Sequence, residues 1–336
     1  MKKIRYKEID LLKGYGIVLM ILGHIPVNSF FMKTIYLFHM PLFFIASGFL
    51  FKKSNQSISE LLKKWFLRLI LPYFIFSLCG YALWVIEIKP QIGEELIKPL
   101  LAILLYNNQD MPITGALWFL SSMLFLYILY YYIFRFIKTE IWRAFMVSGI
   151  VLCGYILNYY KIVLPWSIGI GMIGAFFFYI GHLVFLKYHD ILRCLERNTN
   201  KSLPYLLCVT IIIITYLGIY NGKINMRIGD YGHSFIVFVL VASILTILYL
   251  ILFNLLIQKG SNYFLLVIIE KIGVNSIIYL GLNEVVINLI ASISGKFGIR
   301  GFSYKVFCFF ACILFIQTLI KVLKKNKNIS NLLQIR

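Results

Sequence analysis

Residues 234–257 read SFIVFVLVASILTILYLILFNLLI, a run of 24 residues without a charged side chain. A helix that crosses a lipid bilayer needs about 20 consecutive, largely apolar residues. The run therefore predicts a membrane-spanning helix, and similar runs recur along the whole chain. The ten expected spans are 11–31, 34–51, 66–86, 113–134, 144–160, 165–186, 203–220, 234–257, 273–294 and 302–323.

Two further apolar segments are short. We interpret residues 96–106 as re-entrant or interfacial, because the run is interrupted by Pro99 and ends before Asn107. Residues 262–270 are ambiguous between a surface segment and part of a span.

Composition gives the same class of protein. Of the 336 residues, 61% are hydrophobic and 14% are charged, and the mean hydropathy is +0.86. Soluble globular chains are about 45–50% apolar and about 25% charged, so too few charges are present to cover a surface in water. We expect an all-α, polytopic transmembrane helical bundle whose outer solvent is the lipid bilayer.

The net charge of +20 is spread between the apolar runs and is not gathered on one polar domain. This distribution argues against a nucleic-acid partner and for basic loops that orient membrane helices. With ten spans, one side carries 23 Lys and Arg residues and the other carries nine. Basic loops face the cytoplasm, which predicts that both termini are cytoplasmic.

The chain shows no soluble domain and no internal repeat. We therefore expect one transmembrane domain over residues 1–336, with a basic cytoplasmic tail over about 324–336. The six cysteines include no CxxC pair and no metal-ligand spacing with histidine, so we expect no metal.

The first expected span contains ionisable residues, which are costly at membrane depth and usually mark a site or pathway. Lys13 and His24 are eleven residues apart. At about 100° per residue they share one helix face, with about 16 Å between them along the axis. Asp10 falls near the same face. Alternatively, Asp10 caps the start of the helix and Lys13 extends to the cytoplasmic interface.

A second histidine, His39, lies in the next expected span, in FHMPLFFIASGF. By residue count, His24 and His39 should lie at similar depth in the outer half of the membrane. A lone intramembrane histidine is more often a satisfied packing residue. Two at matched depth favour a functional pair. Glu284 is a weaker indication, since a carboxylate at that depth needs a partner or a proton.

Two stretches resemble a known family. KGYGIVLMILGH (13–24) and FHMPLFFIASGFLF (38–51) are similar to the first two motifs of the acyltransferase-3 family of membrane acyltransferases. Lys13 and His24 match its basic residue and histidine, and His39 and Gly48 match its second helix. Later motifs are similar to RLILPYFIF (68–76), LWFL (117–120) and FFFYIGH (176–182).

The resemblance implies about ten helices and the transfer of an acyl group, usually acetyl, from cytoplasmic acetyl-CoA. The acceptor would be a hydroxyl of an extracytoplasmic or lipid-linked glycan. Within the family the chain looks most like stand-alone polysaccharide O-acetyltransferases, including fucose O-acetyltransferase-like members. This implies a multi-pass protein of the bacterial plasma (inner) membrane. One motif departs from the family, because Asn283 stands where a late histidine is usual.

We expect His24, together with His39, to be catalytic, with His24 as the general base that takes the proton of the acceptor hydroxyl. A histidine can also act as a nucleophile, so an acetyl-histidine intermediate stays open. The donor phosphates need cations at the cytoplasmic mouth. We assign this binding role to Lys13, Arg68, Arg135 and Arg143, of which Lys13 and Arg68 also match family motifs.

Two alternatives come from other classes of protein. A proton-coupled transporter or polysaccharide exporter could use the histidine pair as a proton relay. Inverted repeats and paired broken helices, which favour a transporter, are not evident in the sequence. A non-catalytic anchor or sensor is the other alternative, and it would have no use for the polar helix face.

Overall fold

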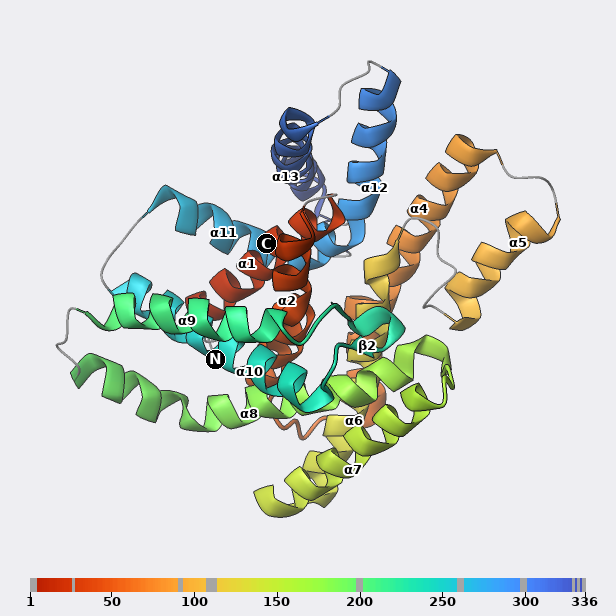
Figure 1. Cartoon of the computed structure of the whole chain (residues 1–336). Coiled ribbons are helices and arrows are strands. Elements are labelled where there is room, and N and C mark those ends of the chain that lie inside the picture. The colour runs from red at the N-terminus through yellow and green to blue at the C-terminus, as the bar shows by residue number, and fades with distance from the viewer. Residues whose placement is uncertain are drawn as a thin grey trace. The chain divides into compact units, whose positions relative to one another are not determined.

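The structure is a computed structural model, and it describes residues 5–25, 28–89, 93–106, 114–197, 202–258, 263–296, 301–327, 330 and 333. Within these residues the chain is almost entirely helical (Figure 1). The long helices and short helical turns are α1 (Lys7–His24), α2 (Ser29–Leu50), α3 (Ile58–Trp65), η1 (Phe66–Ile70), α4 (Leu71–Ile88), α5 (Glu94–Leu101), η2 (Ala102–Tyr106), η3 (Gly115–Leu117), α6 (Trp118–Phe136), α7 (Glu140–Tyr159), η4 (Pro165–Ser167), α8 (Ile168–Arg197), α9 (Leu203–Ile219), η5 (Met226–Ile228), α10 (Phe235–Gln258), α11 (Phe264–Val274), α12 (Ser276–Lys296) and α13 (Phe302–Lys324). A small antiparallel pair, β1 (Ile224–Asn225) and β2 (Asp230–Tyr231), forms the hairpin between α9 and α10.

Eight helices of the described residues are long and apolar enough to cross a membrane. They are Ser29–Leu50, Ile58–Ile88, Gly115–Phe136, Glu140–Tyr159, Pro165–Arg193, Phe235–Gln258, Ser276–Gly295 and Phe302–Lys324. Two more of the expected spans correspond to α9, which is apolar but shorter, and to α1, which carries four charged side chains in its first two turns. The prediction of an all-α, polytopic transmembrane bundle is confirmed.

The first span ends earlier than expected. α1 stops at His24, whereas the sequence suggested a helix as far as residue 31. Pro26 follows in the sequence, and a proline disfavours helical backbone in the residue before it. α2 then begins at Ser29, where the side chain of Asn28 accepts a hydrogen bond of 3.0 Å from the backbone N–H of Phe30. Such a cap fixes a helix start. His24 is therefore the last residue of its helix.

The two short apolar segments are both helical and do not qualify as spans. α5 and η2 cover the first of them. The Tyr73 hydroxyl donates to the carbonyl of Ile103 at 2.6 Å, and the Tyr81 hydroxyl donates to that of Leu96 at 2.9 Å. α11 covers the second and continues to Val274.

The chain divides into two compact units, which we describe separately. Unit 1 comprises Met1–Gly23, Val27–Lys52 and Phe176–Ser276, and unit 2 comprises His24–Pro26, Lys53–Ala175 and Ile277–Arg336. The expectation of a single transmembrane domain over residues 1–336 stays a prediction.

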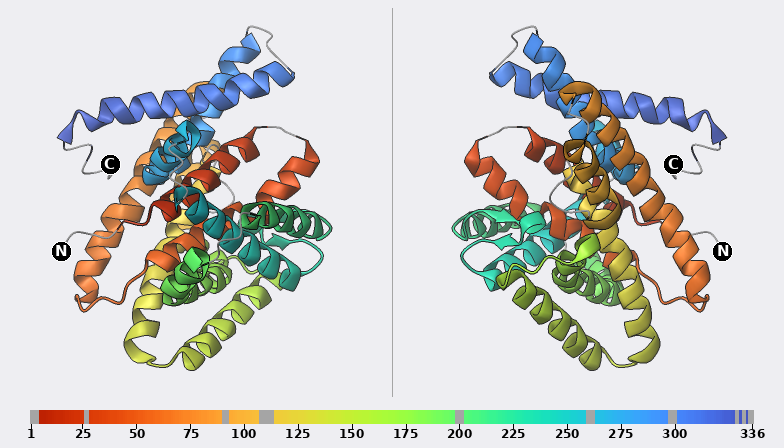
Figure 2. Two further views of the ribbon diagram at one scale, coloured as in Figure 1. Left: turned by 90° about the vertical axis from the view of Figure 1, so that its left-hand side faces the viewer. Right: turned by 90° about the vertical axis from the view of Figure 1, so that its right-hand side faces the viewer.

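In unit 1, α10 packs along α2 and α9 (Figure 2). The contact between α2 and α8 is very close. A Cβ atom on Gly48 would overlap the carbonyl oxygen of Phe178, and one on Gly181 would overlap that of Ile45. Both glycines are therefore required for the two backbones to touch. Both glycines lie in stretches that resemble family motifs, and close helix packing explains why glycine is needed there.

In unit 2, α3 and η1 pack on α6 through a core of Leu61, Trp65 and Tyr131. α12 approaches α4 closely, because a Cβ atom on Gly281 would overlap the ring of Phe76. The Tyr130 hydroxyl also donates to the carbonyl of Ala175 at 2.7 Å. These contacts are made by buried aromatic side chains and glycines, as expected for close helix packing in a membrane.

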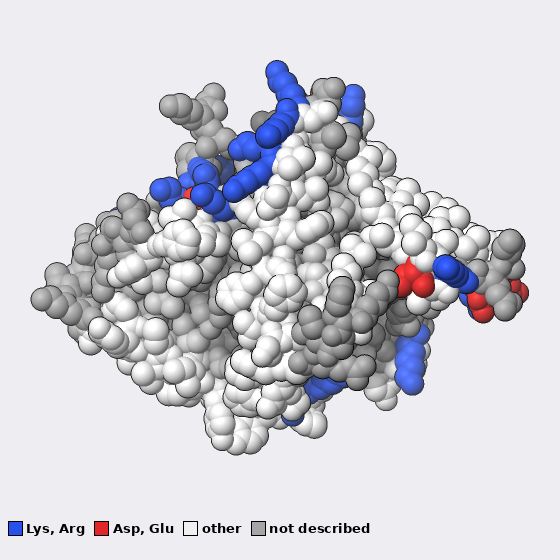
Figure 3. All heavy atoms as spheres, turned by 90° about the horizontal axis from the view of Figure 1, so that it is seen from above, with Lys and Arg blue, Asp and Glu red and all other residues white. Residues whose placement is uncertain are grey.

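Charged side chains are sparse on the surface. In the view of Figure 3 they gather at a few places, and uncharged side chains cover most of the face. Large apolar side chains such as Ile141, Phe145, Leu206 and Phe310 are exposed on the helices. So many exposed large apolar side chains are compatible with lipid and not with water. The protein is a multi-pass membrane protein.

Candidate active site

His24 contacts a carboxylate. Its Nδ1 atom lies 3.2 Å from Oε1 of Glu284, which α12 contributes to unit 2. The side chains are only 25% and 15% exposed, respectively. Neutral or charged, an imidazole at this distance has its Nδ1 atom directed at the carboxylate.

The second oxygen of Glu284 is also engaged. Oε2 accepts a hydrogen bond of 2.5 Å from the backbone N–H of Gly115, the first residue of η3. η3 continues directly into α6, so this N–H is one of the donors that a helix start leaves without an intrahelical partner. A helix start also interacts favourably with negative charge. The carboxylate is thus fixed on both sides.

This arrangement suits a general base. When Nδ1 carries the proton and faces the carboxylate, the other ring nitrogen, Nε2, has its lone pair free to accept a proton. A carboxylate, an imidazole and a reacting hydroxyl form the same order of contacts in hydrolytic triads. Sequence reasoning identified Glu284 as a carboxylate in need of a partner, but it did not find His24 as that partner. The expected position of Glu284 within the membrane was the sequence signal that it needs a partner.

His39 lies in unit 1, on α2. It is buried, and its Nδ1 atom is 2.8 Å from the carbonyl oxygen of Ile35. Because a carbonyl only accepts, the neutral ring carries its proton on Nδ1. Gly23 of α1 faces Ile35 and Tyr36, and the ring of Tyr36 lies 5.0 Å from that of His39. His24 and His39 belong to different units, and their predicted pairing stays a prediction.

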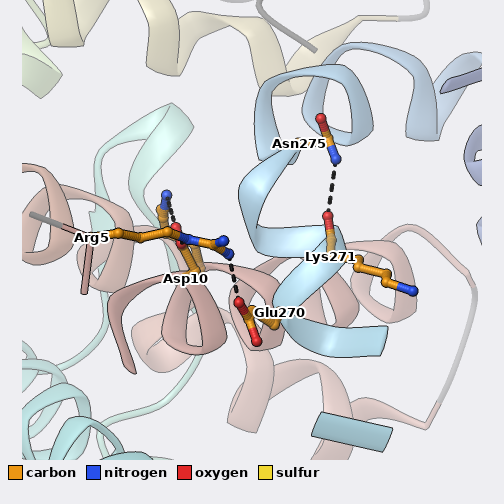
Figure 4. Close-up of polar contacts among 6 residues, drawn as sticks. Arg5, Asp10, Glu270, Lys271 and Asn275 are labelled. Carbon is orange, nitrogen blue, oxygen red and sulfur yellow. Dashed lines mark hydrogen bonds and ion pairs between the residues drawn. The ribbon is translucent and has the colours of Figure 1, made fainter. Parts of the chain in front are cut away.

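Lys13 belongs to a cluster of charges at the beginning of α1, in unit 1. Its Nζ atom lies 2.9 Å from Oδ1 of Asp10, and Nε of Arg5 donates to Oδ2 of the same carboxylate at 2.8 Å. Arg5 also donates to Glu270 of α11 at 2.6 Å, so that it bridges two carboxylates (Figure 4). The hydrogen bond to Asp10 raises the pKa of the Arg5 guanidinium.

α11 is held against α1 by more than this cluster. A Cβ atom on Gly14 would overlap the carbonyl oxygen of Ile269, and one on Gly273 would overlap that of Asp10. The two backbones therefore touch at the level of the charges. The sequence left residues 262–270 ambiguous between a surface segment and part of a span. In the structure α11 packs against α1.

The three arginines predicted to bind the donor lie in unit 2. Arg68 is half-buried in η1, a π-helical segment that continues into α4. Within the described part of the chain, no carboxylate pairs with Arg68. π-Helical turns are rare, and they occur frequently at functional sites. Donor binding by Arg68 stays a prediction.

Arg135 and Arg143 have protein partners. Arg135 donates to the Tyr131 hydroxyl and lies 5.7 Å from the centre of that ring. Arg143 pairs with Glu140 and donates to the carbonyl of Ile137 at 2.9 Å. These contacts of Arg143 stabilise the turn between α6 and α7. Donor binding by either arginine stays a prediction.

Asn283, which replaces the usual family histidine, is occupied by its own helix. Its Nδ2 atom donates to the carbonyls of Tyr279 and Leu280 at 3.0 and 2.8 Å. The side chain of the adjacent residue, Glu284, contacts His24 of α1.

The fold and this site define a polytopic helical membrane protein with a carboxylate-bound histidine. A family model described as an acyltransferase domain, that of the acyltransferase-3 family, matches residues 6–323. The chain therefore belongs to the acyltransferase-3 family and is a membrane acyltransferase. No curated protein and no solved structure matches it.

Proposed function

We propose that the protein is a membrane O-acyltransferase that moves acetyl from cytoplasmic acetyl-CoA to a hydroxyl of an extracytoplasmic or lipid-linked glycan, in a bacterial plasma membrane. The contact between His24 and Glu284, in a chain of the acyltransferase-3 family, carries this proposal. A histidine held by a carboxylate can abstract a proton. Ionisable groups are energetically costly within a membrane, so such a pair there indicates a functional site.

The reaction requires one base. The acceptor hydroxyl loses its proton to Nε2 of His24 while its oxygen attacks the thioester carbonyl carbon. The new C–O bond forms and the C–S bond breaks. The thiolate of CoA leaves and takes up a proton, which the imidazolium can return. In the alternative order, Nε2 attacks the thioester first, the C–S bond breaks and the thiolate of CoA leaves. The hydroxyl oxygen then takes the acetyl group from Nε2, and its proton passes to the freed imidazole and from there to the thiolate.

The donor should enter from the cytoplasmic end of the helices. Its phosphates are anionic and do not enter lipid, so they need cations at the membrane surface. Lys13 precedes His24 by eleven residues on the same helix, or about 16 Å of helix rise. We assign phosphate contacts to Lys13 and Arg68, with Arg135 and Arg143 as further candidates. His39 would assist His24 at the acceptor end.

The test uses purified protein in nanodiscs with acetyl-CoA labelled in the acetyl group. The wild type should bind the donor and release free CoA over repeated turnovers only when an acceptor glycan is present. Release of a single equivalent of CoA without acceptor would indicate the acetyl-histidine order. A transporter or exporter needs no acetyl-CoA, so absence of saturable donor binding would reject the proposal. Mass spectrometry of cell-surface glycans with and without the gene then identifies the acceptor.

A further inference from the structure

We propose that Glu284 is a positioning residue for His24: it fixes the ring through Nδ1 and thereby presents Nε2 to the acceptor hydroxyl. The inference rests on the proposed function, because it assigns a role relative to the base of that reaction. Neither the family resemblance nor the predicted histidine pair gives Glu284 a role.

The geometry restrains the carboxylate at both oxygens. Oε1 faces Nδ1 of His24 at 3.2 Å, and Oε2 accepts from the N–H of Gly115 at 2.5 Å. Rotation of the carboxylate in either direction would break one of these contacts. A backbone N–H at a helix start cannot move without moving the helix, so Gly115 provides a rigid anchor.

The supporting helices are themselves closely packed. α12 is fixed on α4 by Gly281, whose missing side chain makes room for the Phe76 ring. α4 also reaches the residue before the anchor, because a Cβ atom on Gly80 would overlap the methyl group of Thr114. Thr114 is buried. Helix packing within unit 2 therefore fixes both Glu284 and the Gly115 N–H that donates to it.

The chemical consequence is a choice of tautomer. A carboxylate only accepts hydrogen bonds, so it selects the ring with hydrogen on Nδ1 and leaves Nε2 as the base. It also stabilises the imidazolium that forms when Nε2 takes the proton, without becoming protonated itself.

Glu284→Gln tests this choice. The amide oxygen of glutamine can still accept from Gly115, and its NH2 group then faces Nδ1. Donation to Nδ1 would place the ring proton on Nε2 and remove the base. We expect kcat to fall by at least about 100-fold, the lower limit for loss of a general base. The KM for acetyl-CoA should stay within about twofold, since Glu284 does not contact the donor in this scheme.

Two variants serve as controls. Glu284→Asp keeps an acceptor-only group and should retain more activity than Glu284→Gln, which a merely structural role would not predict. Asp190→Asn removes a carboxylate that pairs with Arg193 at the surface of α8, and it should leave both constants unchanged.

The wild-type protein offers a measurement that does not depend on any variant folding. In protein with ¹⁵N-labelled histidine rings, the His24 signals, assigned by their loss in His24→Ala, should show hydrogen on Nδ1 when the ring is neutral. Hydrogen on Nε2 would overturn the inference. Near-normal kcat in Glu284→Gln with an inactive His24→Ala would also overturn it while leaving the proposed function intact. The proposed function fails instead if the wild type shows neither saturable acetyl-CoA binding nor acetyl transfer.

Discussion

Lys13 and Asp10 form an ion pair, with 2.9 Å between Nζ and Oδ1, and neither side chain is more than 21% exposed. The residue that matches the basic family motif is therefore neutralised by its own helix before a donor arrives. Arg5 and Glu270 complete a chain of two cations and two carboxylates. A donor phosphate must share Lys13 with Asp10 or replace it.

Lys13→Ala should weaken donor binding more than it slows the chemical step. One charge-assisted hydrogen bond contributes about 1.5–3 kcal/mol, or roughly 10- to 100-fold in affinity. The Kd of acetyl-CoA, measured by calorimetry, should rise by this factor, and donor analogues that lack phosphates should be less sensitive. An unchanged Kd together with a large loss of the transfer rate would show that Lys13 acts in the chemical step and not in donor binding.

Backbone contact should hold α11 on α1 more strongly than charge does. Arg5 is 52% exposed, so its pair with Glu270 should contribute at most about 1 kcal/mol. Glu270→Gln should therefore change the midpoint of thermal unfolding only slightly. Gly273→Ala forces a methyl group onto the carbonyl of Asp10 and should cost about 1–3 kcal/mol. A larger effect of Glu270→Gln than of Gly273→Ala would show that the ion pair dominates.

His24→Ala should abolish acetyl transfer while the protein stays folded and inserted. Removal of a general base typically costs about 10²–10⁴ in rate. Turnover should be measured on purified protein, with gel filtration and donor binding as checks of integrity. Near-normal turnover would exclude His24 as the base.

The sequence was sufficient for the membrane class and for most of the spans, because bilayer thickness sets a length that apolar runs either reach or miss. It also placed Lys13 and His24 on one helix. The end of α1 was harder to predict, since the apolar run continues beyond His24. Pro26 was the available indication of a stop.

The partners of the site residues could be predicted less well. Asp10 and Lys13 are three residues apart, a spacing that brings side chains together on a helix, so their pair was within reach of the sequence. The contact between His24 and Glu284 joins α1 to α12, and no local pattern encodes it. It depends on how α12 packs against α4 and η3.

Gly48→Ala should destabilise the protein, because a methyl group there would meet the carbonyl of Phe178 on α8. Overpacking of this kind costs about 1–3 kcal/mol. The matched control is Gly149→Ala on α7, where a Cβ atom would find nothing within 4 Å. Thermal unfolding followed by tryptophan fluorescence should separate the two variants. Equal midpoints would mean that α2 and α8 can move apart at little cost.

The direction of transfer tests the orientation and the mechanism together. The 23 basic residues on one face against nine on the other predict that α1 begins in the cytoplasm. α1 has 18 residues and therefore rises about 27 Å, close to the roughly 30 Å of a bilayer core. His24, its last residue, should then lie near the outer side. We predict that the acetyl group crosses most of the membrane within the protein and that the acceptor hydroxyl is presented from outside. In sealed vesicles of known orientation, label from acetyl-CoA on the cytoplasmic face should reach acceptor that is accessible only from the opposite face. Transfer that requires donor and acceptor on the same cytoplasmic side would contradict this model, even in a protein that proved to be an acetyltransferase.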